Sequence, residues 1–485
     1  MVNFRIISKI IGSLLFIEGL FMGWCALMSF AYHEDDLMAF LISLLLTFGS
    51  GFFFLYLGRD ADNSLNRRDA YVVVTAAWAV FSFFGMFPFL IHGSITNITD
   101  AFFESTSGFT TTGATIIDDV EILPHGILFW RSLTQWIGGL GIVFFTIAIL
   151  PSLVGGSVKV FAAEATGPIK AKMHPRLTTT AKWIWSIYLI LTLACVLSYC
   201  AAGMNWFEAI NYSMTTTATG GFTIHNAGTC FYDSAAIDYI SILFQFMAGI
   251  NFTLLYVSIF KMNASALFKN SEFKLYISMV MLATLGIMSV LLIRMSYPLE
   301  QAFRNSLYQV VSFITTTGVF NDEVGAWPHI TWIILGIVMF VGGCAGSTAG
   351  GFKCVRAVMT LKVLRNNFRQ IIHPNAVLPV KVNGQSVADA RITALFAFFT
   401  LFVLMMIITT GFMIISGIDP INAITIGLSC VSNVGPSLSN HVGPVMSWVG
   451  MADYVKWALC LLMLMGRLEI MTVLVLFTRS FWKEN

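Results

Sequence analysis

Runs of threonine and glycine recur at four places in this chain and offer oxygen ligands without any charge. The first reads STSGFTTTGATI from Ser105 to Ile116, and TTTATGGFTI, ITTTGVF and the weaker echo VSNVGPS begin at Thr215, Ile314 and Val431. Backbone carbonyls and hydroxyls in such a run can replace the water around a dehydrated cation without a charge that would trap it. Because no Asp or Glu lies within the four runs, a monovalent cation fits better than a divalent one.

One glycine in each run supplies a register for comparing the four copies. We align Gly113, Gly220, Gly318 and Gly435. Glycine tolerates a positive φ and leaves room where four chains crowd around one axis. Hydroxyl and glycine residues also let membrane helices pack closely, which is the alternative explanation for any single run. Four copies at the same topological place favour a pore instead.

The elements that position these runs belong to a membrane protein. The chain has 485 residues, of which 57% are hydrophobic and 11% charged, and its mean hydropathy is +0.80. This composition excludes an ordinary soluble domain. The eight cysteines lie mostly inside apolar segments without a Cys-x-x-Cys pair, so we interpret them as small core residues.

About ten apolar stretches are long enough to cross the roughly 30 Å of a hydrocarbon core. The connections between them are basic on one side and acidic on the other, and basic connections mark the cytoplasmic side, so both termini are expected inside. The expected crossings lie near residues 8–30, 37–58, 71–92, 127–151, 182–203, 237–260, 275–294, 329–372 with a break, 392–416 and 452–479.

Each threonine and glycine run follows a short, semi-polar segment on the acidic side. Such a segment is too short to span, so we expect it to enter as a re-entrant helix and to return as a loop that lines protein or water. The predicted fold is an all-α integral membrane protein with four pseudo-symmetric helix, pore-loop, helix repeats around one ion pathway. The expected boundaries are 1–66 for a two-helix N-terminal extension and 67–155, 175–262, 272–372 and 388–485 for the four repeats.

A second glycine-rich stretch, from Gly342 to Gly351, has five glycines in ten residues. Each glycine costs a helix roughly 1 kcal/mol relative to Ala, so the stretch predicts a helix break below the third run. A close helix crossing is the alternative. Arg467 lies at a similar depth in the last span, and a charge facing lipid there would cost at least about 2.5 kcal/mol. It must therefore face protein or water, and a structural pair with Glu469 is the alternative to a role at the break.

With these motifs the chain resembles the superfamily of TrkH, KtrB and Hkt potassium transport proteins over nearly its whole length. That family is related to potassium channels, whose filter signature is TVGYG, and TATGGF comes nearest to it here. The other three loops keep one glycine, so the expected filter favours K⁺ and Rb⁺ while admitting some Na⁺. The resemblance carries the filter role over to Thr110, Thr111, Thr112, Gly113, Ala218, Thr219, Gly220, Thr316, Thr317, Gly318, Asn433, Val434 and Gly435.

By the same resemblance, the predicted helix break is expected to be an intramembrane loop that obstructs the pore below the filter. The expected gate consists of Gly342, Gly343, Gly346, Gly350 and Gly351, together with Arg467, whose guanidinium can bond carbonyls freed near Gly346. The family is homodimeric and works with a cytoplasmic, nucleotide-binding regulatory subunit of the TrkA type. Lys353 to Arg369 and the loop at residues 159–176 are the basic surfaces on which such a subunit could dock.

The function expected from these features is K⁺ uptake across a bacterial inner membrane, by conduction through the filter and gating at the loop. The sequence has no Walker A motif, phosphorylation-type Asp motif or Rossmann fingerprint, so we expect no enzyme activity, no organic cofactor and no nucleic-acid partner. The rival is a secondary carrier that couples K⁺ to H⁺ or Na⁺. Such carriers favour inverted repeats, whereas these four repeats share one orientation.

Overall fold

The fold is built almost entirely from helices. The computed structural model describes residues 2–61, 65–141, 177–438 and 447–483, and the structural statements below concern these residues. Within them, the one sheet is a two-stranded hairpin of β1 (Lys381–Val382) antiparallel to β2 (Gln385–Ser386). The prediction of an all-α membrane fold is confirmed.

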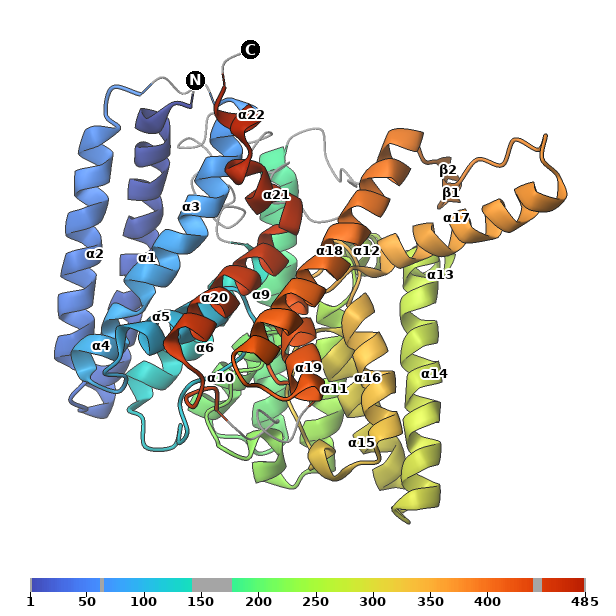
Figure 1. Ribbon diagram of the computed structural model, residues 1–485. Coiled ribbons are helices and arrows are strands. Elements are labelled where there is room, and N and C mark those ends of the chain that lie inside the picture. Colours follow the sequence, from blue (N-terminus) through green and yellow to red (C-terminus); the bar gives the residue numbers. More distant parts are fainter. Residues whose placement is uncertain (1, 62–64, 142–176, 439–446, 484–485) are drawn as a thin grey trace.

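Two N-terminal helices, α1 (Phe4–Tyr32) and α2 (Leu37–Leu57), form an antiparallel pair at one edge of the molecule (Figure 1). Their glycines allow close approach, since a Cβ on Gly12 would lie 2.7 Å from the carbonyl oxygen of Gly51. In the most apolar stretch of 18 residues, 72% of the residues of α1 are buried, compared with only 28% of those of α2. The first helix therefore packs on the repeats, while the second covers it from outside.

The remaining helices form four repeats, and each repeat contains one short helix that does not span. These pore helices are α5 (Ile98–Phe109), α10 (Trp206–Ala218), α15 (Leu299–Ile314) and α19 (Pro420–Ser432). In Figure 1 they lie between the N-terminal pair at one edge and the long helix α14 at the other. The flanking helices are α3 (Arg67–Gly85), α4 (Phe87–His92) and α6 (His125–Leu140) in the first repeat; α9 (Leu177–Ala201), α11 (Ala235–Ala248) and α12 (Phe252–Phe260) in the second; α14 (Ser271–Arg294), α16 (His329–Val341) and α17 (Cys354–Ile372) in the third; and α18 (Asp389–Ile415), α20 (Asp453–Leu468) and α21 (Ile470–Leu474) in the fourth.

Short elements complete the connections between these helices. They are the helices α13 (Ser265–Lys269) and α22 (Arg479–Trp482) and the 3-10 turns η1 (Gly228–Tyr232), η2 (Val324–Ala326) and η3 (Val475–Phe477). The two chain termini lie at the same end of the molecule, and α17 projects sideways beyond the other helices (Figure 1).

The described residues hold six helices that are long and apolar enough to cross a membrane, or eight if each of two bent pairs counts as one span. The bends were not predicted. The expected crossing at 237–260 is broken between α11 and α12 by 106°, and the one at 452–479 between α20 and α21 by 114°. The expected crossing at 127–151 begins with α6, and its second half lies outside the described residues.

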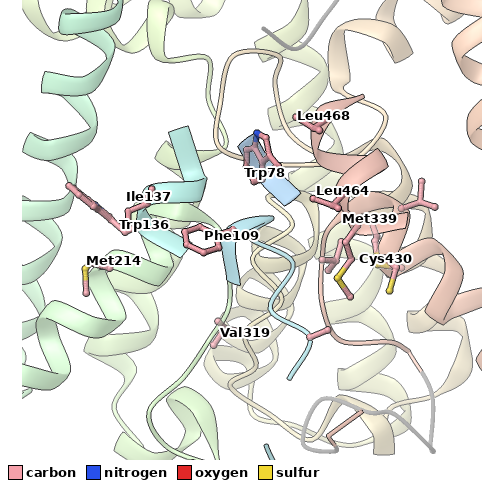
Figure 2. Packing of buried hydrophobic residues seen from close by; sticks show 14 of the residues in the cluster. Trp78, Phe109, Trp136, Ile137, Met214, Val319, Met339, Cys430, Leu464 and Leu468 are labelled. Atoms are coloured by element: carbon pink, nitrogen blue, oxygen red, sulfur yellow. The ribbon is translucent and has the colours of Figure 1, made fainter. Parts of the chain in front are cut away.

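A single cluster of buried apolar side chains surrounds the pore helices. Figure 2 shows part of it, with Trp78 of α3, Phe109 from the end of α5, Met339 of α16 and Leu464 of α20 among the labelled residues. Phe109 also meets Trp130 of α6 edge-on, with ring centroids 6.2 Å apart. Each pore helix also packs on a helix of a neighbouring repeat: α5 on α20, α10 on α6, α15 on α11 and α19 on α16. This packing fixes where the ends of the pore helices point.

Candidate ion pathway

The four pore helices end in the same way, each in a residue with left-handed backbone. These residues are Thr111 (φ 55°), Thr219 (54°), Thr316 (58°) and Asn433 (55°). The next residue then donates its N–H to a carbonyl five positions back, which is the usual way of closing a helix C-terminus. The four bonds are Thr112 to Ser107 (2.9 Å), Gly220 to Thr215 (2.9 Å), Thr317 to Ser312 (2.8 Å) and Val434 to Ser429 (3.0 Å).

A left-handed glycine follows two residues later in every repeat. These are Gly113 (φ 80°), Gly221 (83°), Gly318 (73°) and Gly435 (98°). The equivalent glycine of the second repeat is therefore Gly221, and the alignment on Gly220 was one residue off. Gly220 corresponds to Thr112, Thr317 and Val434, so the predicted filter residues of this repeat stop one position short of its left-handed glycine.

Each left-handed glycine packs against a backbone carbonyl of the next repeat. A Cβ on Gly113 would lie well under 3.0 Å from the oxygen of Gly220, and Gly221 has the same relationship with Thr317. Gly318 in turn meets the Val434 oxygen, and Gly435 meets that of Thr112, which closes the circle. Four equivalent segments therefore meet around one axis, and only glycine fits at the four junctions.

This arrangement gathers oxygen dipoles in one place. The C-terminal ends of four helices converge on the ring, and each contributes about half a negative charge. Among the described residues there is no group of three or more His, Cys, Asp or Glu that could hold a metal ion. The ligands on offer to an ion at the ring are therefore backbone carbonyls and threonine hydroxyls, which suit a monovalent cation in transit.

A cavity of about 270 Å³ lies against the ring. It is lined by the three glycines Gly113, Gly221 and Gly318, and it also carries the acidic residues Asp322 and Glu323. The basic residue in its lining, Arg131, forms a buried ion pair with Glu104 at 2.9 Å, so the acidic residues set the charge of the cavity. A concave, acidic mouth raises the local concentration of cations. We call this cavity the vestibule.

The predicted filter residues all lie at these helix ends. Thr110 caps α5 and Ala218 is the last residue of α10, so both precede the ring. The hydroxyls of Thr110 and Thr112 lie 2.8 Å apart, as do those of Thr315 and Thr317 in the third repeat. In each pair one hydroxyl also donates to a carbonyl of its own helix, Thr110 to Thr106 O and Thr315 to Val311 O, both at 2.7 Å.

The glycine-rich stretch between α16 and α17 is a loop, as predicted. It contacts pore-helix ends, which precede the ring, whereas the vestibule is lined by the ring glycines and residues that follow them. Gly342, Gly346 and Gly351 have positive φ values of 70°, 75° and 78°. The N–H of Gly350 donates to the Thr316 hydroxyl at 2.7 Å. Three further bonds reach other repeats: Gly351 N–H to Ser432 O at 3.0 Å, and the Thr348 hydroxyl to Thr217 O and Ala248 O at 3.2 Å each.

Two further side chains, which the sequence analysis did not identify, hydrogen-bond the backbone of this loop and of the start of α17. Asn251, at the bend between α11 and α12, donates its Nδ2 to the Ala345 carbonyl at 2.5 Å. Glu272 of α14 accepts the N–H groups of Ala345 at 2.6 Å and Val355 at 3.1 Å. A polar Asn inside an apolar span was the one local signal, and it also explains the unpredicted bend, because Asn251 caps α12 through Thr253 N–H.

Arg467 bridges this loop to the end of α6. Its Nη1 donates to Thr348 O at 2.8 Å, and its Nη2 donates to Gly138 O at 2.6 Å and Gly139 O at 2.5 Å. The contact expected near Gly346 is therefore made at Thr348, two residues further on. Glu469, the alternative partner considered for Arg467, forms an ion pair with Arg356 of α17 at 2.5 Å.

Comparison with known proteins gives consistent matches over the whole length. A family model described as TrkH, cation transport protein, matches residues 37–484. The chain is 37% identical to the Trk system potassium uptake protein TrkH of Halomonas elongata and 32% identical to TrkG of Escherichia coli, covering 99% of this chain and 100% and 99% of those proteins. The crystal structure of the potassium transporter TrkH from Vibrio parahaemolyticus superposes with a TM-score of 0.89 at 35% identity, covering 99% of this chain and 100% of that one.

Proposed function

Because the chain belongs to the TrkH family of cation transport proteins, we propose that it takes up K⁺ through a gated, channel-like pathway. The observation that carries the proposal is the closed ring of four left-handed glycines, each packed on a carbonyl of the next repeat. K⁺ is the transported ion in this proposal, in keeping with the printed names of the relatives. The four-loop ring is the selectivity filter, with Gly221 added to the residues expected from the sequence.

The ring favours K⁺ and Rb⁺ and admits some Na⁺. Its loops share one left-handed glycine each, and the segments that follow differ: Ala114, Phe222, Val319 and Pro436 come next in the four repeats. Proline has no N–H and a fixed φ, so the fourth segment cannot repeat the geometry of the others beyond the ring. Fewer equivalent oxygen layers make the preference among monovalent cations looser.

The loop between α16 and α17 is the gate in this proposal. Its Gly350 and Gly351 bond residues of the third and fourth pore-helix ends directly, so an ion leaving the ring meets the loop next. Arg467 ties the loop to α6 through Thr348 O. A fixed cation there also repels K⁺, so both effects hold the pathway closed until the loop moves.

The proposal includes a homodimer in the bacterial inner membrane, with cytoplasmic termini and a TrkA-type nucleotide-binding subunit. Within the basic stretch named as a docking surface, Lys353 and Arg356 are buried, so docking is left to the outer half of α17, where Arg365 and Arg369 are exposed. The same half exposes Leu361, Leu364, Phe368, Ile371 and Ile372, an apolar face on a projecting helix that a second copy would cover. The other docking surface, residues 159–176, lies outside the described residues.

Reconstitution into planar bilayers separates this proposal from a coupled carrier. With unequal K⁺ on the two sides, conduction predicts a current that reverses near the K⁺ equilibrium potential and does not respond to an imposed H⁺ gradient, while an imposed Na⁺ gradient shifts the reversal potential only as far as the small Na⁺ permeability of the filter allows. Coupling of K⁺ to H⁺ shifts the reversal potential when the H⁺ gradient is changed, and coupling to Na⁺ shifts it by the amount that a fixed K⁺ to Na⁺ stoichiometry requires. Either of these shifts would replace the channel-like pathway with the carrier.

A further inference from the structure

Gln135 belongs to the first repeat, and its side chain hydrogen-bonds the filter segment of the second repeat. Gln135 lies on α6 and is fully buried. Its Nε2 donates to the carbonyl oxygen of Gly220 at 2.7 Å, and its Oε1 accepts the N–H of Phe222 at 3.0 Å. One side-chain amide thus bonds the backbone on both sides of the left-handed Gly221.

The double glycine of the second repeat is explained by this contact. A Cβ on Gly220 would lie 2.5 Å from Gln135 Oε1 and 2.9 Å from its Cγ, so any larger residue would collide with the amide. The other three repeats carry Thr112, Thr317 and Val434 at this position. Gln135 therefore occupies space that the filter segment itself would fill in the other repeats, and Gly220 is the residue that admits it.

We propose that Gln135 is a positioning residue of the filter, which sets the preference for K⁺ over Na⁺ by fixing the Gly220 carbonyl. The inference rests on the proposed function, because it assumes that this carbonyl ring selects the ion. Na⁺ is smaller than K⁺ and needs its oxygens closer to the axis. A carbonyl tied to Gln135 Nε2 cannot move inward without losing a buried hydrogen bond, which disfavours the smaller ion.

Gln135 could instead be a purely structural contact between α6 and the second repeat. That role predicts lower stability on substitution and an unchanged ion preference in the protein that remains folded. A matched control is Gln245 on α11, a buried glutamine of the neighbouring inner helix whose Oε1 has no hydrogen-bond partner within the described part of the chain. Its removal takes away a similar volume without touching the Gly220 carbonyl.

The test compares full-length, reconstituted variants by their reversal potentials with K⁺ on one side and Na⁺ on the other. Gln135→Ala removes both bonds, and Gln135→Glu keeps the shape and the acceptor while removing the donor to Gly220. We expect both to raise Na⁺ permeability relative to K⁺ by roughly 2- to 10-fold, the factor that one hydrogen bond represents. Gln245→Ala should leave the ratio unchanged.

A compensating pair keeps the test decisive if a single variant folds poorly. Gly220→Ala should reduce folded protein and flux because its Cβ meets Gln135, and the double variant Gly220→Ala with Gln135→Ala should recover both. An unchanged ratio in Gln135→Ala and Gln135→Glu, or a double variant no better than Gly220→Ala alone, would overturn the inference. If Gly113 and Gly318 variants alter the ratio while the Gln135 variants do not, the proposed filter stands and the role of Gln135 falls; if none of them alters it, the filter itself falls.

Discussion

Gly113, in the loop of the first repeat, lies so close to the carbonyl oxygen of Gly220 that no Cβ fits between them. The same contact joins the second loop to the third, the third to the fourth and the fourth back to Thr112. Because the circle is closed, a displacement at one junction is passed on to its neighbours. If the ring is the filter that we propose, ion preference is a property of the four loops together, and a change in any one glycine should alter it.

Replacing Gly113 or Gly318 with Ser should raise Na⁺ permeation relative to K⁺. The new Cβ meets a carbonyl oxygen of the next repeat, and the positive φ costs an L-residue roughly 1–2 kcal/mol. If that strain is released by moving the ring, the preference for K⁺ should fall by about 10-fold. Reversal potentials of the reconstituted variants with K⁺ opposite Na⁺ measure the effect.

Gly93 supplies the control for backbone strain. It has a φ of 82°, close to that of Gly113, but a Cβ there would meet nothing within 4 Å. Gly93→Ser should therefore cost stability without altering ion preference. An unchanged preference in both filter variants would show that these loops are not the filter. A comparable change in the Gly93 variant would show that strain alone accounts for the effect.

Replacing Gly350 with Ala should increase K⁺ flux in the absence of any partner. A Cβ at this position collides with the carbonyl oxygen of Ser432, so the loop must withdraw from the filter and lose the Gly350 N–H bond to Thr316. Rubidium uptake into vesicles, normalised to folded protein, measures the flux. The matched control is Gly336→Ala on α16, where the added methyl meets nothing within 4 Å. A Gly350 variant that folds and conducts less than the parent would count against the loop as a gate.

The repeat architecture and the break after α16 could be predicted because residues close together in the sequence determine both. Glycine and threonine recur in register in four loops, and five glycines in ten residues cannot form a stable helix. The register of the second loop could not be settled in this way, because Gly220 and Gly221 are adjacent and either satisfies the pattern. Only the left-handed φ of Gly221 distinguishes them.

The residues that were missed act through distant parts of the chain. The bend after α11 depends on Asn251, whose partner Ala345 lies in the third repeat, and the bend after α20 occurs at Glu469, which pairs with Arg356 of α17. Gln135 contacts the backbone of the next repeat and leaves no trace in its own helical segment. A hydrophobic pattern reports on which face of a helix is buried, and it carries no information about which polar side chain reaches which carbonyl.

Cys230 should report on the vestibule through a pH-dependent block. It is an exposed free cysteine in η1 and lines the cavity beside the ring. Partial burial, followed by the carboxylates of Asp322 and Asp238, raises the pKa of its thiol to about 11. A trimethylammonium methanethiosulfonate reacts with the thiolate, whose fraction grows about tenfold per pH unit below the pKa. We expect labelling to accelerate about tenfold per unit from pH 7 to 9 and to reduce Rb⁺ uptake.

The Cys230→Ser variant keeps a small polar residue and should be insensitive to the reagent. Labelling of the parent protein that goes to completion without any loss of uptake would show that ions do not pass this cavity. A rate that is independent of pH would instead contradict the raised pKa of the thiol.

Arg467→Ala should raise K⁺ flux even without a regulatory partner. The flux of Arg467→Lys should lie between that of Arg467→Ala and that of the parent protein. The guanidinium bonds Thr348 O on the loop with one nitrogen and the carbonyls of Gly138 and Gly139 with the other, so it ties the loop to the end of α6. Alanine removes both the tie and the positive charge. Lysine keeps the charge but lacks the planar fork that reaches the two sides at once.

Arg356 provides the comparison that separates gating from stability. Arg356 pairs with Glu469 and stacks on Phe398, with 3.9 Å from its Cζ to the ring centroid. Removing it leaves a carboxylate without this partner, so Arg356→Ala and Glu469→Ala should both lower the melting temperature and leave uptake per folded molecule unchanged. If Arg467→Ala shows the same pattern, with matched loss of stability and unchanged Rb⁺ uptake per molecule, Arg467 supports the fold and has no part in the gate.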